Sequence, residues 1–223
     1  PPRGRLLLFH GYYANRNQVL GIAQMLRQRQ YEILLFELRG HGARPGPCTL
    51  GLREVEDAQR VLEWARQDGS GGDVPVGVLG LSMGAAVACY VASCTPAIRA
   101  VAVDSMYAHF FPMVRRAIGF RYHLPAVPWA WMTWWTLELM LGRRLSRLDP
   151  IQLAPRLHQP VLVIQGGQDQ VVEPSWSEAV YQRWAGPKER WVEPEAGHVG
   201  TFQKDPQAYQ HRVAGFFDRP IAA

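Results

Sequence analysis

The chain has 223 residues, of which 48% are hydrophobic and 19% are charged. A chain of this length and composition can bury the core of one globular domain, which argues against disorder. The formal net charge is +5, but the basic residues are spread along the sequence with no run longer than two, so the charge predicts no nucleic-acid partner.

Short apolar segments alternate with amphipathic ones, a pattern typical of a parallel sheet with helices on both faces. The predicted strands are Arg5–Phe9, Glu32–Leu38, Val76–Leu81, Ala100–Val103, Val161–Gln165 and Arg190–Val192. The predicted helices are Gln18–Gln30, Leu52–Gln67, Met83–Cys94, Pro174–Trp184 and Pro206–Phe217. Gly69–Gly72 is interpreted as a turn. We therefore expect one α/β domain over residues 1–223, with a mostly parallel sheet of about six strands.

The alternation breaks at residues 107–148, where no segment has the pattern of a strand and four of the eight tryptophans lie. We predict that this stretch is a helical cap, or lid, inserted into the domain. Two interpretations stay open. The cap packs on the core, or it is a lid whose Trp131, Trp134 and Trp135 line an apolar substrate pocket.

The cap also contains a segment that resembles a membrane helix in composition. Leu124–Leu141 has a single charged residue, Glu138. Pro125 and Pro128 interrupt its start, and a membrane span there would divide the α/β pattern. The arginines that flank it are Arg115, Arg116, Arg121, Arg143, Arg144 and Arg147. Shallow, peripheral attachment to a membrane surface is therefore an open alternative.

Residues 80–84 have the pattern G-x-S-x-G, directly after a predicted strand and directly before a predicted helix. A nucleophile on such a sharp turn needs small neighbours because the strand and the helix pass close by, and Gly80 and Gly84 supply that space. An ordinary N-cap serine is the alternative. The context favours Ser82 as the nucleophile.

His198 follows the last predicted strand, where a histidine can reach the carboxyl edge of the sheet and act as a general base. Asp169 follows the predicted strand Val161–Gln165. The three residues then occur in the order serine, aspartate, histidine, which is the order expected of a triad in this fold. Asp104 is the rival for the acid, and Glu173 and Glu195 are weaker candidates. A loop histidine and a turn aspartate without catalytic roles are the alternative.

The backbone N–H groups of Tyr12 and Met83 are predicted to form an oxyanion hole for the reacting carbonyl. His10 is interpreted as a residue that holds the loop after the first strand. The histidines never lie at ligand spacing beside carboxylates or thiols, so we expect no metal. Residues 80–84 do not match the phosphate-binding patterns, and we expect no cofactor.

Several motifs together resemble the α/β-hydrolase superfamily over almost the whole chain. They are His10–Gly11, Arg39–Gly40–His41–Gly42, Gly80–Gly84, Gly166–Gly167–Gln168–Asp169 and Gly197–His198. Residues 103–105 and 202–217 look like the Bem46-like group of serine hydrolases. The resemblance implies that Ser82 sits on a nucleophile elbow, and it supports Asp169 over Asp104. The expected sheet lacks the first two strands usual in the family, so either an upstream segment is missing or the sheet is a minimal version.

These residues predict a carboxylesterase-like serine hydrolase, in which Ser82 attacks an ester, His198 transfers the proton and water hydrolyses the acyl-enzyme. The expected partner is a small ester with an apolar part. Thioesterase, lactonase and amidase activities stay open, because the same triad serves them. The alternative of another class is a non-catalytic protein that binds a hydrophobic ligand, or a membrane-associated protein.

The chain has three cysteines, Cys48, Cys89 and Cys94, at neither metal-ligand nor CxxC spacing. We expect free thiols, with Cys89 and Cys94 buried in a helix. Free thiols favour a reducing compartment, and the sequence does not open with the pattern of a signal peptide. We therefore expect a cytoplasmic location.

Overall fold

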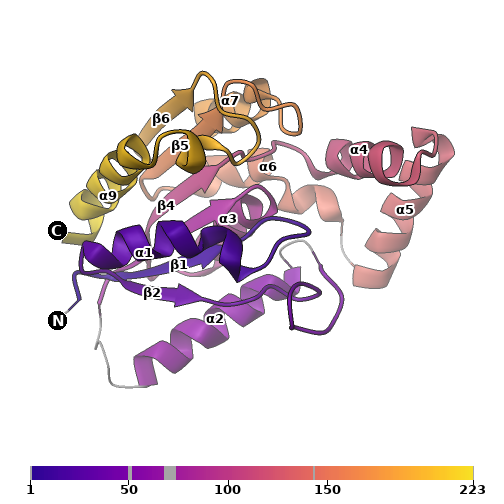
Figure 1. Cartoon of the computed structure of the whole chain (residues 1–223). Helices are drawn as coiled ribbons and strands as arrows, with labels where there is room; N and C mark the ends of the chain where they lie inside the picture. Colours follow the sequence, from indigo (N-terminus) through magenta and orange to yellow (C-terminus); the bar gives the residue numbers. More distant parts are fainter. Residues whose placement is uncertain (1, 50–51, 68–73, 143, 223) are drawn as a thin grey trace.

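A computed structural model describes residues 2–49, 52–67, 74–142 and 144–222, and these form a six-stranded sheet between two layers of helices (Figure 1). Across the sheet the strands are β2 (Glu32–Leu35), β1 (Arg5–Phe9), β3 (Val76–Leu81), β4 (Ile98–Asp104), β5 (Val161–Gly166) and β6 (Lys188–Glu193). Every neighbouring pair is parallel. The predicted α/β fold and its six strands are confirmed.

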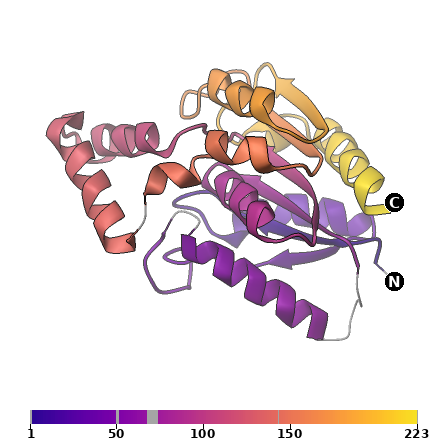
Figure 2. The same cartoon turned by 180° about the vertical axis from the view of Figure 1, so that it is seen from behind.

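Each face of the sheet is covered by helices, because its central strands are apolar on both faces. In β1, Leu6 and Leu8 face one core, while Leu7 and Phe9 face the other. The first core is closed by α1 (Leu20–Gln28), α8 (Thr201–Lys204) and α9 (Pro206–Ala222). The second is closed by α2 (Leu52–Gln67), α3 (Met83–Cys94), α6 (Pro150–Leu153) and α7 (Pro174–Arg183). In Figure 2 the helices that close the second core lie in front of the sheet.

Residues 110–148 form a helical insertion between β4 and β5. It consists of α4 (Phe110–Tyr122), α5 (Ala126–Leu141) and the 3₁₀ helix η2 (Leu145–Leu148), and α4 and α5 extend away from the sheet in both views (Figures 1 and 2). The insertion has a small hydrophobic core of its own, formed by Val114, Ile118, Ala130, Trp134 and Leu145. Among the described residues, no helix is long and apolar enough to cross a membrane.

Several predicted boundaries differ from those of the structure. Strand β2 ends at Leu35 rather than Leu38, because the Leu38 N–H is donated to the ring of His10 (3.1 Å) instead of to a neighbouring strand. The first predicted helix divides into η1 (Arg16–Val19) and α1. All three cysteines are free, but Cys94 is exposed because it ends α3. The turn predicted at residues 69–72 and the side chain of Arg143 lie outside the described residues.

The sheet order changes direction between β1 and β3. The chain leaves β1 toward α1 on one face and leaves β3 toward α3 on the other. The loops that follow these two neighbouring strands therefore diverge and leave a crevice at the carboxyl edge, the usual ligand position in open α/β sheets.

Helix α3 begins in direct backbone contact with β1 and β3. A Cβ atom added to Gly80 would lie 2.1 Å from the carbonyl oxygen of Gly84. A Cβ atom added to Gly84 would lie 2.3 Å from the carbonyl oxygen of Phe9. Both clashes are with backbone, which cannot rotate away, so only glycine fits at these positions.

We expect Gly84→Ala to lower the free energy of unfolding by about 3 kcal/mol or more, because α3 must move off β1 to admit a methyl group. Gly215→Ala in α9 is the matched control. Nothing lies within 4 Å of the added carbon there, and the change should stabilise the protein by about 0.5–1 kcal/mol. Thermal unfolding followed by circular dichroism measures both. An unchanged Tm in Gly84→Ala would contradict the packing described here.

Candidate active site

Ser82 occupies the sharp turn between β3 and α3. Its backbone has φ 52° and ψ −114°, a conformation that costs a residue with a side chain about 1–3 kcal/mol. The Ser82 N–H is donated to the carbonyl oxygen of Asp104 (2.8 Å), and its own carbonyl accepts the N–H of Ala85 (3.0 Å). Neighbouring backbone thus holds the turn in its strained form.

The structure brings Ser82, His198 and Asp169 into one hydrogen-bonded line. His198 Nδ1 lies 2.8 Å from Asp169 Oδ2, and His198 Nε2 lies 2.9 Å from Ser82 Oγ. Because a carboxylate can only accept, the ring proton is assigned to Nδ1, and Nε2 is left to accept the Ser82 hydroxyl. This tautomer can take the serine proton.

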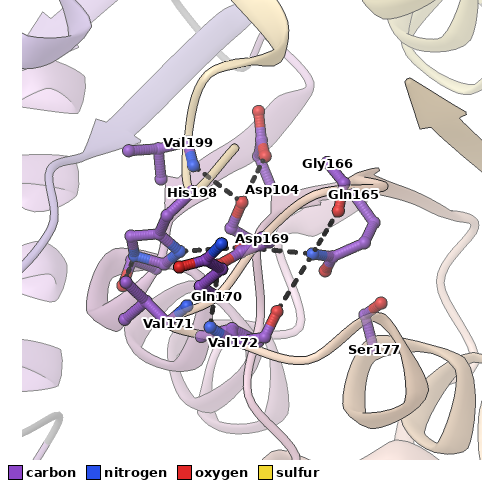
Figure 3. A network of polar contacts seen from close by, with 12 residues as sticks. Asp104, Gln165, Gly166, Asp169, Gln170, Val171, Val172, Ser177, His198 and Val199 are labelled. Atoms are coloured by element: carbon purple, nitrogen blue, oxygen red, sulfur yellow. Dashed lines mark hydrogen bonds and ion pairs between the residues drawn. The ribbon is translucent and has the colours of Figure 1, made fainter. Parts of the chain in front are cut away.

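Asp169 lies at the centre of a polar network, between His198 and Gln165 (Figure 3). Its Oδ1 accepts the N–H groups of Val171 (2.9 Å) and Val172 (2.8 Å), and its Oδ2 also accepts the Gln165 amide (3.1 Å). Burial acts to raise the pKa of Asp169, but the hydrogen bonds from His198 and the two backbone groups outweigh it, so the pKa lies below its ordinary value. Asp169 is therefore ionised beside the imidazole.

Asp104, the rival for the acid, is bound elsewhere. Its Oδ1 accepts the Ser105 hydroxyl (3.0 Å), and the Ser105 oxygen in turn accepts the N–H of Val199 (2.9 Å). Burial raises the pKa of Asp104 to about 7. The weaker candidates also have other partners, since Glu173 pairs with Arg116 and Glu195 pairs with Lys204. Asp169 is the acid in contact with His198.

The loop after β1 lies against the serine turn. A Cβ atom added to Gly11 would lie 3.5 Å from the Ser82 Cβ. His10 holds this loop, because its Nδ1–H is donated to the carbonyl of Gly11 (2.9 Å) and its Nε2 accepts the Leu38 N–H. Burial lowers the pKa of His10, which suits a neutral ring with one donor and one acceptor.

A cavity of about 550 Å³ opens beside Ser82, between the sheet and the α4–α5 insertion. The predicted oxyanion-hole residues Tyr12 and Met83 line it together with Ser82. The other lining residues are mostly apolar: Tyr13, Cys48, Tyr107, Phe110, Met113, Val114, Ile118, Leu124, Trp129, Thr133 and Leu137. Among the described residues, no group of three or more His, Cys, Asp or Glu side chains could hold a metal ion.

The prediction that Trp131, Trp134 and Trp135 line the pocket is wrong. Trp134 is buried between α5 and α4, while Trp131 and Trp135 lie on the exposed side of α5. The residue that reaches the cavity is Trp129, with Thr133 one turn later. Residues four apart share a face of a helix. The cavity-facing side of α5 therefore consists of Trp129, Thr133 and Leu137, which are spaced four residues apart.

Comparisons with known proteins agree with this fold. Residues 6–210 match the model of the alpha/beta hydrolase family. The uncharacterized protein YqkD of Bacillus subtilis is 24% identical over 96% of this chain and 70% of its own length, and Rv2307c of Mycobacterium tuberculosis is 30% identical over 93% and 66%. The chain thus spans about two thirds of these relatives. The esterase Pf2001 of Pyrococcus furiosus superposes with a TM-score of 0.81 at 24% identity, covering 99% of this chain and 84% of that one.

The raised pKa of Asp104 predicts a pH-dependent stability. Between the ordinary value of 3.8 and about 7, the folded protein keeps a proton that the unfolded chain has released, so rising pH lowers stability across this window. Asp104→Asn removes this dependence. Melting curves from about pH 4 to about pH 8 should show the parent Tm falling relative to that of the variant up to about pH 7 and then running parallel to it. Parallel curves throughout would contradict the raised pKa.

Proposed function

The chain belongs to the alpha/beta hydrolase family, and we propose that it is a serine hydrolase that cleaves carboxylic esters. The observation that carries the proposal is the hydrogen-bonded line from Ser82 through His198 to an ionised Asp169. A serine hydroxyl is a weak nucleophile unless an adjacent base accepts its proton. This site supplies both the base and a carboxylate that orients it.

In the proposed reaction, Ser82 Oγ attacks the ester carbonyl while His198 Nε2 accepts its proton. The resulting imidazolium is stabilised by the Asp169 carboxylate, and it then gives the proton to the departing alcohol. Water, deprotonated by the same nitrogen, hydrolyses the acyl-enzyme and restores Ser82. Each proton that leaves an oxygen is thus accepted by His198 and returned.

The backbone N–H groups of Tyr12 and Met83 are the proposed oxyanion hole. Both residues line the cavity with Ser82, and they come from the two loops that diverge at the crevice. Met83 opens α3, so the positive end of the helix dipole also lies beside the developing charge. A pair of donors in this position would stabilise the tetrahedral intermediate.

The cavity supports a substrate with an apolar acyl or alcohol part. Its lining is mostly aromatic and aliphatic, and its volume of about 550 Å³ fits a chain of moderate length. Pf2001, which shares the fold, is described as an esterase. Thioesters, lactones and small amides present the same carbonyl chemistry to the triad, and esters are the class to assay first.

Hydrolysis of p-nitrophenyl butyrate by three variants tests the triad. Ser82→Ala removes the nucleophile and should abolish turnover. Asp169→Asn should lower kcat by about 10⁴-fold, because the amide favours the wrong imidazole tautomer. Asp104→Asn is the matched control and should lose far less activity, since that carboxyl bonds to Ser105 and not to His198.

Circular dichroism must first show that all three variants are folded. A larger loss in Asp104→Asn than in Asp169→Asn would move the acid to Asp104. Retained turnover in Ser82→Ala would refute the serine mechanism, and a folded parent without activity on any ester would refute the substrate class.

A second test concerns acyl-chain length. Thr133 lines the cavity and Thr136, on the same helix, does not. Thr133→Trp should fill part of the cavity and lower kcat/KM for p-nitrophenyl octanoate by about tenfold or more relative to the acetate. Thr136→Trp makes the same change outside the cavity and should leave the ratio unchanged. Equal ratios in both variants would show that the acyl chain binds elsewhere.

A further inference from the structure

Helix α5 is mostly apolar around its circumference: one side packs on α4 and a second side faces the cavity. Ala130 and Trp134 pack on α4, where the Trp134 ring lies 5.8 Å from that of Phe110. Trp129 and Thr133 face the cavity. A helix that is apolar all round is normally buried all round, so the third side needs an explanation.

The third side of α5 is largely exposed, although the Trp131 ring at its edge lies 4.4 Å from that of Phe111 in α4. It carries Trp131, Met132, Trp135 and Leu139, which we call the outer face. The exposed fraction of these side chains rises from 44% at Trp131 to 85% at Leu139. Scattered exposed apolar residues are common, but a contiguous group containing two tryptophans marks a surface that binds something.

The charge of the insertion indicates what it binds. Residues 107–148 contain six arginines and a single acidic residue, Glu138. Their formal net charge of +5 equals that of the whole chain, so the other residues are neutral in sum. The Glu138 carboxylate accepts the backbone N–H of Leu145 (2.8 Å) at the end of α5, whereas Arg115, Arg144 and Arg147 are exposed.

We propose that the outer face of α5 binds the surface of an anionic lipid bilayer. Tryptophan is well suited to the boundary between headgroups and acyl chains, because it has an apolar body and one polar N–H. The exposed arginines elsewhere on the insertion add longer-range attraction to anionic headgroups. A second copy of the chain fits less well, since pairing through this face would bring two insertions of the same charge together.

The cavity reaches the surface on the same insertion. Leu124 and Trp129 both line it, and their exposed fractions are 40% and 43%. The opening of the cavity and the outer face therefore belong to the same insertion, on different sides of α5. Delivery of an apolar ester from the bilayer to Ser82 rests on the proposed function, whereas binding to the bilayer does not.

Co-sedimentation with lipid vesicles tests the proposal, with Ser82→Ala as the parent so that hydrolysis cannot affect the result. The vesicles are phosphatidylcholine alone or mixed with phosphatidylglycerol. The test variant carries Trp135→Gln and Leu139→Gln on the outer face. The matched control carries Trp64→Gln on α2 and Leu20→Gln on α1, where the side chains are 58% and 43% exposed.

We expect the parent and the control to bind mixed vesicles but not neutral ones, and the outer-face variant to bind about tenfold less. High salt should weaken binding. Absent binding to mixed vesicles, or equal binding by the outer-face variant, would overturn the proposal. So would a dimer of the parent, seen by sedimentation equilibrium, that the outer-face variant abolishes while neither protein binds lipid. Esterase activity of the serine protein is measured separately, so the two proposals can fail independently.

Discussion

Backbone atoms of three elements meet at the end of β3 with no space for a side chain between them. Gly80 and Gly84 let α3 begin against β1 and β3, and this contact forces the intervening Ser82 into a positive φ. The same contact sends α3 to one face of the sheet while α1 covers the other, so that the loops after β1 and β3 diverge. The cavity beside Ser82 depends on this arrangement.

The positions of Asp169 and His198 depend on contacts between the two loops that carry them. The N–H of Gln168 is donated to the carbonyl of Ala196 (2.9 Å), and a Cβ atom added to Gly166 would lie 2.4 Å from the carbonyl oxygen of Gly197. These contacts fasten the loop after β5 to the loop after β6. Asp169 and His198 are therefore in contact without a bound ligand, which would avoid an ordering cost in the proposed reaction.

Much of the fold could be predicted because its signals are local. Apolar strands between amphipathic helices identify a parallel sheet, and the glycines around Ser82 identify the turn; the predicted fold and superfamily are confirmed. Asp169 and His198 could be named because parallel strands bring their carboxyl ends to one edge. The tryptophan that lines the cavity could not be predicted in this way. Helix α5 is mostly apolar around its circumference, and only its packing on α4 decides which side faces the cavity. The Bem46-like resemblance stays a prediction.

The insertion between β4 and β5 has one more consequence. Most of the cavity wall opposite Ser82 comes from residues 107–137, a single contiguous stretch, whereas Ser82, Asp169 and His198 lie in the loops after β3, β5 and β6. The proposed catalytic residues and the wall of the proposed substrate pocket are thus encoded separately. If the proposed function holds, exchange of this one segment, with both of its attachment points kept, would change the substrate preference while leaving Ser82, Asp169 and His198 in place, which makes the stretch the natural target for a mutant library.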